Sequence, residues 1–184
     1  LIGQVMAPLH SKGVLDNTVV IVTADHGDML GERGLWFKMV YFERSIRVPL
    51  IMSWPGHLRS RRVTQNASLI DILPTLVDIA TEGKPFAPAA PLGGASLMPL
   101  ARGESKGWAD TVYGEYMAEG TFEPAFMIKR GNLKYITAKN DPPQLYDTAK
   151  DPNELTNLAG SDERAADFAA EAATRWDSDA IRAD

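Results

Sequence analysis

The feature that most constrains the fold is a short run of β-branched and apolar residues, NTVVIV, that directly follows a helical pattern. Ile2, Val5, Met6 and Leu9 recur at helical spacing, which predicts a helix over residues 1–12 with one buried face. Gly, Asp and Asn then favour a turn, and residues 18–23 have the composition of a central strand buried on both faces. A helix, a tight turn and a buried strand predict an α/β unit of a parallel sheet.

The next segments continue this arrangement up to residue 95. Residues 24–47 are polar and irregular, and loops of that length are typically functional or disordered. A second short strand is predicted over residues 48–53, where the sequence WPG ends it. A helix follows to Ala80 and is predicted to start near Asp71, because Asp71 then serves as N-cap and Pro74 falls within the first turn. Residues 81–95 are rich in Pro, Ala and Gly and are predicted to form a surface loop.

The C-terminal half has a different pattern. Short aromatic and β-branched runs separated by turn residues predict a small antiparallel sheet over residues 108–147. An Ala-rich segment predicts a closing helix over residues 161–182, with Ser161 as its N-cap. We therefore expect two domains, a portion of an α/β core over residues 1–95 and a small α+β subdomain over residues 96–184.

Composition excludes several classes of function. The chain has 184 residues, which suffices for a real hydrophobic core, and its net charge of −5 comes with a single basic cluster, Arg59 to Arg62, interpreted as a solvated turn. Nucleic acid is therefore not an expected partner. No apolar run approaches the roughly 20 residues that span a membrane, and no signal peptide is evident. The chain starts at Leu1 within a helical pattern, as expected for part of a longer polypeptide.

The absence of cysteine excludes disulfides, thiolate metal ligands and a cysteine nucleophile within these 184 residues. It is consistent with a reducing compartment, and we expect a cytoplasmic location.

Asp25 and His26 follow the first predicted strand, at the sheet edge where α/β enzymes bind ligands. A carboxylate beside an imidazole suits a divalent cation, and Gly27 would permit a close backbone approach and a sharp exit. From spacing alone, an Asp25 that caps the next turn and a His26 that is a satisfied polar residue form an alternative interpretation.

Lys38 follows an aromatic pair, Trp36 and Phe37. A lysine fixed between apolar neighbours can serve as a point charge against an anionic oxygen. A lysine whose apolar stem lies along the surface and whose ammonium reaches solvent has the same sequence context.

The stretch NTVVIVTADHGDMLGERGLWFKMVYFERSIRVPLIMSWPG resembles the sulfatase branch of the alkaline phosphatase superfamily, and within it the bacterial choline sulfatases. The resemblance continues in family order with ASLIDILPTLVDIA, LYDTAKDPNELTNLA and RWDSDAI, and so covers most of the chain. It implies an α/β fold, namely the C-terminal part of an alkaline-phosphatase-like sandwich followed by a small antiparallel sheet and a closing helix.

The resemblance also implies the chemistry. Asp25 and His26 would hold one divalent metal, Ca²⁺ first and Mn²⁺ or Mg²⁺ as alternatives, and Lys38 would contact the sulfate group and the bridging oxygen. The family nucleophile is a formylglycine made from the Cys of a Cys-x-Pro/Ala-x-Arg motif, which is absent here. We therefore expect a C-terminal fragment that is inactive alone and, in the complete enzyme, hydrolyses choline-O-sulfate, with homo-oligomerisation implied by the family.

The segment TVYGEYMAEG is predicted to contact the substrate. Strand alternation places Tyr113 and Glu115 on one face and Tyr116 on the other. The resemblance aligns Glu115 with the carboxylate that faces the choline ammonium, whereas from the residues alone it is an ordinary solvent-facing strand residue. Because His26 is shared with related phosphonate and phosphate ester hydrolases, a phosphonate monoester or phosphodiester hydrolase is the alternative function. A non-catalytic assembly module is another.

Overall fold

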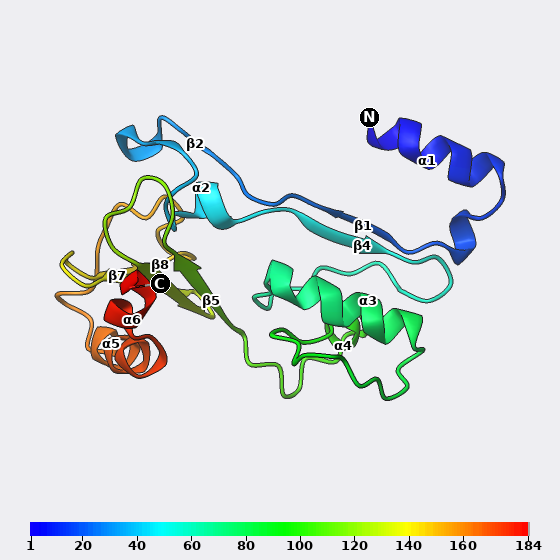
Figure 1. The fold of residues 1–184 in the computed structure, drawn as a ribbon. Helices are drawn as coiled ribbons and strands as arrows, with labels where there is room; N and C mark the ends of the chain where they lie inside the picture. Colours follow the sequence, from blue (N-terminus) through cyan, green and yellow to red (C-terminus); the bar gives the residue numbers. More distant parts are fainter. Residues whose placement is uncertain (184) are drawn as a thin grey trace. The chain divides into compact units, whose positions relative to one another are not determined.

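A computed structural model describes residues 1–183, and the chain packs as two compact units (Figure 1). Unit 1 consists of Leu1–Asp25 and Val48–Trp108, and unit 2 of His26–Arg47 and Ala109–Asp184. The units are discontinuous in sequence and so differ from the predicted contiguous division into residues 1–95 and 96–184. The reason is that the segment 26–47 packs on the C-terminal sheet.

Unit 1 begins with helix α1 (Ile2–Ser11), a single 3-10 turn (Leu15–Asn17) and strand β1 (Val20–Thr23). The helix and strand are confirmed, but no residue of α1 is buried, so its predicted buried face is absent. Strand β1 pairs antiparallel with β4 (Leu50–Ser53) and is only partly buried. The parallel pairing and two-sided burial predicted for it are therefore wrong within the described residues, because an apolar run does not specify the direction of its neighbour.

The helical part of unit 1 contains a 3-10 turn (Leu69–Asp71), α3 (Ile72–Ala80) and α4 (Met98–Arg102), the last not predicted. The boundary at Asp71 is confirmed, but the cap lies further upstream: Ser68 and Asp71 form a capping box, in which Asp71 Oδ2 accepts the Ser68 amide hydrogen at 2.8 Å. Asp71 Oδ1 accepts the Ala95 amide hydrogen at 2.9 Å, which fixes the end of the predicted loop over residues 81–95.

Unit 2 is built on the predicted antiparallel sheet, which has four strands in sequence order: β5 (Thr111–Tyr116), β6 (Ala125–Arg130), β7 (Leu133–Ala138) and β8 (Gln144–Asp147). The predicted closing helix is two helices, α5 (Arg164–Arg175) and α6 (Ser178–Ala183). They are separated at Trp176, whose backbone is extended and whose side chain is buried in the core.

Ser161 does not cap α5, in contrast to the sequence prediction. Asp162 Oδ1 instead accepts the amide hydrogen of Arg164, the first helical residue, at 3.0 Å.

Strand alternation gives the sheet of unit 2 two covered faces. One face packs against α5 and Trp176 through a core that includes Phe126, Ile128, Tyr135, Leu145 and Phe168. The opposite face contacts the segment 26–47 through Tyr146 and Ile136. This segment contains β2 (Met29–Leu30), a 3-10 turn (Glu32–Gly34), β3 (Trp36–Phe37) and α2 (Glu43–Ile46), so it is more ordered than predicted. None of the described helices has the length and apolar character needed to cross a membrane.

Candidate functional site

The segment 26–47 is fixed to the sheet of unit 2 by a small apolar core. Met29 and Phe42 are buried against Tyr146 of β8, with Leu35 and Val40 packed beside them. Arg33 lies over the Phe42 ring, 4.2 Å from its centroid, and its guanidinium donates to the backbone carbonyl of Glu154. The polar residues of this segment are therefore carried by a backbone that this apolar core holds in place.

His26 and Lys38, at opposite ends of the β2–β3 hairpin, are brought together by it. Lys38 Nζ lies 2.7 Å from His26 Nε2, and His26 Nδ1 lies 2.7 Å from the Gly27 carbonyl oxygen. Because a carbonyl oxygen only accepts hydrogen bonds, Nδ1 carries the proton and the Nε2 lone pair accepts from the Lys38 ammonium. A histidine whose Nδ1–H is held by a backbone carbonyl has the arrangement common in metal-ligating histidines, with Nε2 as the coordinating atom.

Helix α2 positions both of these residues. The Gly27 amide donates to the Ser45 carbonyl at 2.7 Å, and Ser45 Oγ donates to the Lys38 carbonyl at 2.6 Å. A Cβ at Gly27 would lie 2.0 Å from the Arg44 carbonyl oxygen, so only glycine fits, and the close approach predicted from the sequence is confirmed. Ser45 is 1% exposed and links the neighbour of His26 to the backbone of Lys38.

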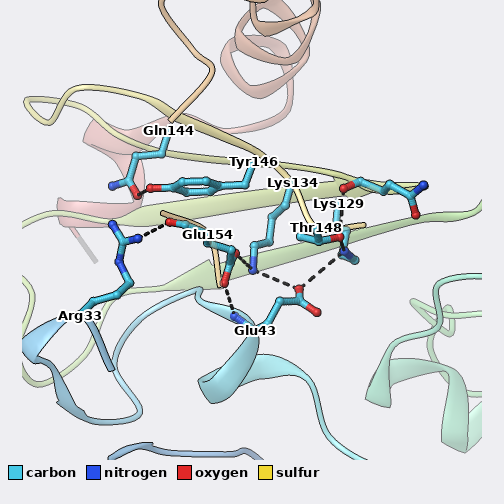
Figure 2. Close-up of polar contacts among 9 residues, drawn as sticks. Arg33, Glu43, Lys129, Lys134, Gln144, Tyr146, Thr148 and Glu154 are labelled. Atoms are coloured by element: carbon cyan, nitrogen blue, oxygen red, sulfur yellow. Dashed lines mark hydrogen bonds and ion pairs between the residues drawn. The ribbon is translucent and has the colours of Figure 1, made fainter. Parts of the chain in front are cut away.

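A buried ionic cluster holds α2 against the sheet (Figure 2). It consists of Glu43 on α2, Lys129 on β6, Lys134 on β7 and Glu154 in the loop after β8. Lys134 Nζ lies 3.1 Å from Glu43 Oε1 and contacts Glu154 Oε1, and Lys129 Nζ lies 3.6 Å from Glu43 Oε1. Glu154 Oε2 also accepts the Glu43 amide hydrogen at 2.7 Å. Sequence analysis missed this cluster, because its members are scattered through the chain.

The cluster is electrostatically balanced, with two ammonium groups and two carboxylates. Lys129 and Lys134 stand directly opposite each other on neighbouring strands, a repulsive pairing unless carboxylates compensate it. Burial opposes ionisation of Glu43, but the ammoniums of Lys134 and Lys129 outweigh it and lower the pKa of its carboxyl. Glu154 adopts a left-handed φ of 56°, a costly conformation for a non-glycine residue that the surrounding contacts must maintain.

Glu115 lies on the other face of the sheet from the segment 26–47. Its Oε1 accepts the Trp176 indole hydrogen at 2.6 Å, and the residue remains exposed. Tyr113 shares this face, as predicted, but the Arg175 guanidinium lies 3.7 Å from its ring centroid. On the opposite face, Tyr41 packs beside Gly114, where a Cβ would lie 2.7 Å from Tyr41 Cε1. The structure thus brings Lys38 to His26 but not to Glu115.

Asp25, the other predicted metal ligand, belongs to unit 1 and is exposed. Among residues 1–183, no three His, Asp or Glu side chains gather to form a complete metal site. The donor types of Asp25 and His26, a carboxylate and an imidazole, are nonetheless those that bind divalent cations, and the Lys38 ammonium would have to release His26 Nε2 for that atom to coordinate one.

The acidic turn that follows β8 is held by hydrogen bonds from its own backbone to its side chains. Asp147 Oδ1 accepts the amide hydrogens of Ala149 and Lys150, and Asp151 Oδ2 accepts that of Thr156 at 2.8 Å. These bonds shape the loop that carries Glu154 to the cluster.

Comparison with known proteins agrees with this architecture. Residues 31–176 match the family model described as N-sulphoglucosamine sulphohydrolase, C-terminal. The chain is 39% identical over 192 residues to a choline-sulfatase of Rhizobium meliloti, covering 99% of this chain and 36% of that protein. It is 34% identical over 172 residues to arylsulfatase K of Rattus norvegicus, covering 86% and 29%.

A similar solved structure is the phosphonate monoester hydrolase of Agrobacterium radiobacter, at 32% identity and a TM-score of 0.78, covering 94% of this chain and 37% of that one. The chain therefore spans about a third of the length of the relatives it matches.

Proposed function

We propose that this chain, which belongs to the sulfatase family described as N-sulphoglucosamine sulphohydrolase, C-terminal, is part of an enzyme that hydrolyses choline-O-sulfate. In that enzyme it would form the C-terminal part. The observation that carries the proposal is the 2.7 Å contact between Lys38 and His26, which places a cation beside a potential metal ligand. The choice of substrate is supported by the 39% identity to a choline-sulfatase over nearly the whole chain.

In the proposed reaction, the residues of this chain bind and stabilise the anionic sulfate. Asp25 and His26 would hold one divalent cation, most plainly Ca²⁺, which when bound polarises the sulfate oxygens as a Lewis acid. Lys38 offsets the negative charge that develops between sulfur and the departing oxygen. The nucleophile, a formylglycine by family resemblance, would come from outside these 184 residues, which contain no cysteine.

From the family resemblance, Glu115 is proposed to face the quaternary ammonium of choline, although its side chain lies on the opposite face of the sheet from the segment that carries Lys38 and His26. The neighbouring aromatic rings of Tyr113 and Trp176 provide the combination of carboxylate and π faces that binds such cations. Because Arg175 covers one face of Tyr113 and Trp176 is buried and stacked on Phe126, this proposal relies on the exposed carboxylate of Glu115.

Glu115→Gln in the full-length enzyme tests this substrate assignment. The glutamine keeps an oxygen that accepts from the Trp176 indole and removes only the charge. We expect KM for choline sulfate to rise about tenfold, the scale of one cation contact, while KM for an uncharged aryl sulfate stays unchanged. The matched control is Glu119→Gln, which removes the charge of another exposed carboxylate, in the loop after β5, and should leave both KM values unchanged.

The alternative is a phosphonate monoester hydrolase, favoured by the structural similarity at a TM-score of 0.78. Equal effects of Glu115→Gln on both sulfate substrates, together with faster turnover of a phosphonate monoester than of choline sulfate, would support this alternative.

A further inference from the structure

We infer that the buried cluster of Glu43, Lys129, Lys134 and Glu154 is a positioning device that sets Lys38 and His26 for catalysis. The inference rests on the proposed function of those two residues. In this inference the four side chains of the cluster contact neither the substrate nor a metal. They position Lys38 and His26 by fixing α2.

The connection begins in the sheet. Lys134 is 0% exposed and extends from β7 to the carboxylates of Glu43 and Glu154 (Figure 2). Glu154 binds Glu43 at a second point, because its Oε2 accepts the Glu43 amide hydrogen. Glu43 is the first residue of α2, so both its side chain and its backbone are fixed at the start of the helix.

Ser45 completes the connection two residues later. Its carbonyl oxygen accepts from Gly27, and its hydroxyl donates to the carbonyl of Lys38. A four-residue helix is too short to be stable by itself, so its position depends on these tertiary contacts. A displacement of α2 would therefore move both functional residues together.

The charges explain why the connection is rigid. Removing one member of a buried ion pair leaves an uncompensated charge, which costs more than the pair contributes. The two lysines on neighbouring strands require the carboxylate of Glu43, and Glu43 in turn can occupy only the place where both ammoniums reach it. The cluster thus selects one position for α2.

A double-mutant cycle in the full-length enzyme tests the inference. Ser45→Ala removes the bond to Lys38 without adding bulk or charge, and we expect kcat/KM for the sulfate ester to fall about tenfold, the equivalent of one hydrogen bond. In a Lys38→Ala background the same change should cost less than about twofold, because a residue that acts through Lys38 has no further effect once Lys38 is absent. Glu43→Gln should also lower kcat/KM, and in the Lys38→Ala background it should keep only the part of that loss that comes through His26.

The control is Lys150→Met, which removes an exposed lysine of the same unit and should leave kcat/KM unchanged. Equal losses from Ser45→Ala in both backgrounds, or a lower Tm with unchanged kcat/KM, would overturn the inference alone. If Lys38→Ala itself is without effect, the proposed role of Lys38 fails and the inference with it. Should Glu43→Gln fail to fold, the Ser45→Ala cycle decides.

Discussion

Lys38 Nζ lies 2.7 Å from His26 Nε2, so the ammonium of one residue is held by the lone pair of the other. The contact fixes the Lys38 head group, although the residue is exposed. We predict that Lys38→Ala lowers kcat of the full-length enzyme by about 10²–10³-fold, the usual scale for one preorganised electrostatic contact. Steady-state kinetics with a sulfate ester checks this, and a variant within twofold of wild type would remove Lys38 from the mechanism.

Gly27→Ala is expected to be strongly destabilising. The new methyl group would lie 2.0 Å from a backbone carbonyl oxygen of α2, which no side-chain rotation relieves. We expect a loss of about 1–3 kcal/mol in the free energy of unfolding, measured by denaturant titration. Gly160→Ala is the matched control, because a Cβ there meets nothing within 4 Å. Equal stabilities of the two variants would contradict the observed packing of α2 against Gly27.

The depressed pKa of Glu43 predicts acid sensitivity. Its stabilising contribution is fully present above the ordinary carboxyl pKa of about 4.3 and is lost as pH falls through the lower folded-state value. Stability measured between pH 6 and 2 should therefore fall less steeply in Glu43→Gln than in wild type, although the variant is less stable at neutral pH. Parallel pH profiles would show that Glu43 does not contribute to acid unfolding.

Asp162 is predicted to stabilise the start of α5. It accepts the Arg164 amide hydrogen and pairs with the Arg164 guanidinium, whose hydrogen bonds lower the pKa of Asp162 to about 2. Asp162→Asn retains an acceptor for the amide but loses the ion pair, whereas Asp162→Ala loses both. Thermal unfolding should give Tm in the order wild type, Asn, Ala, and an alanine variant as stable as wild type would rule out the capping role.

The 184-residue chain is predicted to show no turnover of a chromogenic sulfate ester by itself. It has no cysteine from which a formylglycine could form, and its two proposed metal ligands, Asp25 and His26, are too few to complete a metal site. Measurable turnover by the purified chain, abolished by Lys38→Ala, would overturn this expectation and place a nucleophile within these residues.

The sequence determined the local elements and the family. Period-2 runs predict β5 to β8, and helical spacing predicts α1, α3 and α5, because these patterns depend on residues only a few positions apart. The ordered motifs likewise identify the sulfatase family, which the family model confirms. The sequence also predicts a close backbone approach at Gly27, and the structure confirms it at the Arg44 carbonyl.

Only the tertiary structure decided which elements meet. No local sequence pattern indicates that β1 pairs antiparallel with β4. The same is true of two long-range contacts, the hydrogen bond from Trp176 to Glu115 across 61 positions and the contact of Lys134 with Glu43 across 91 positions. An isolated Lys or Glu has the same local context whether it is solvated or buried opposite a partner. Its partner is fixed only when the sheet brings distant segments together, because burial then requires each charge to be compensated.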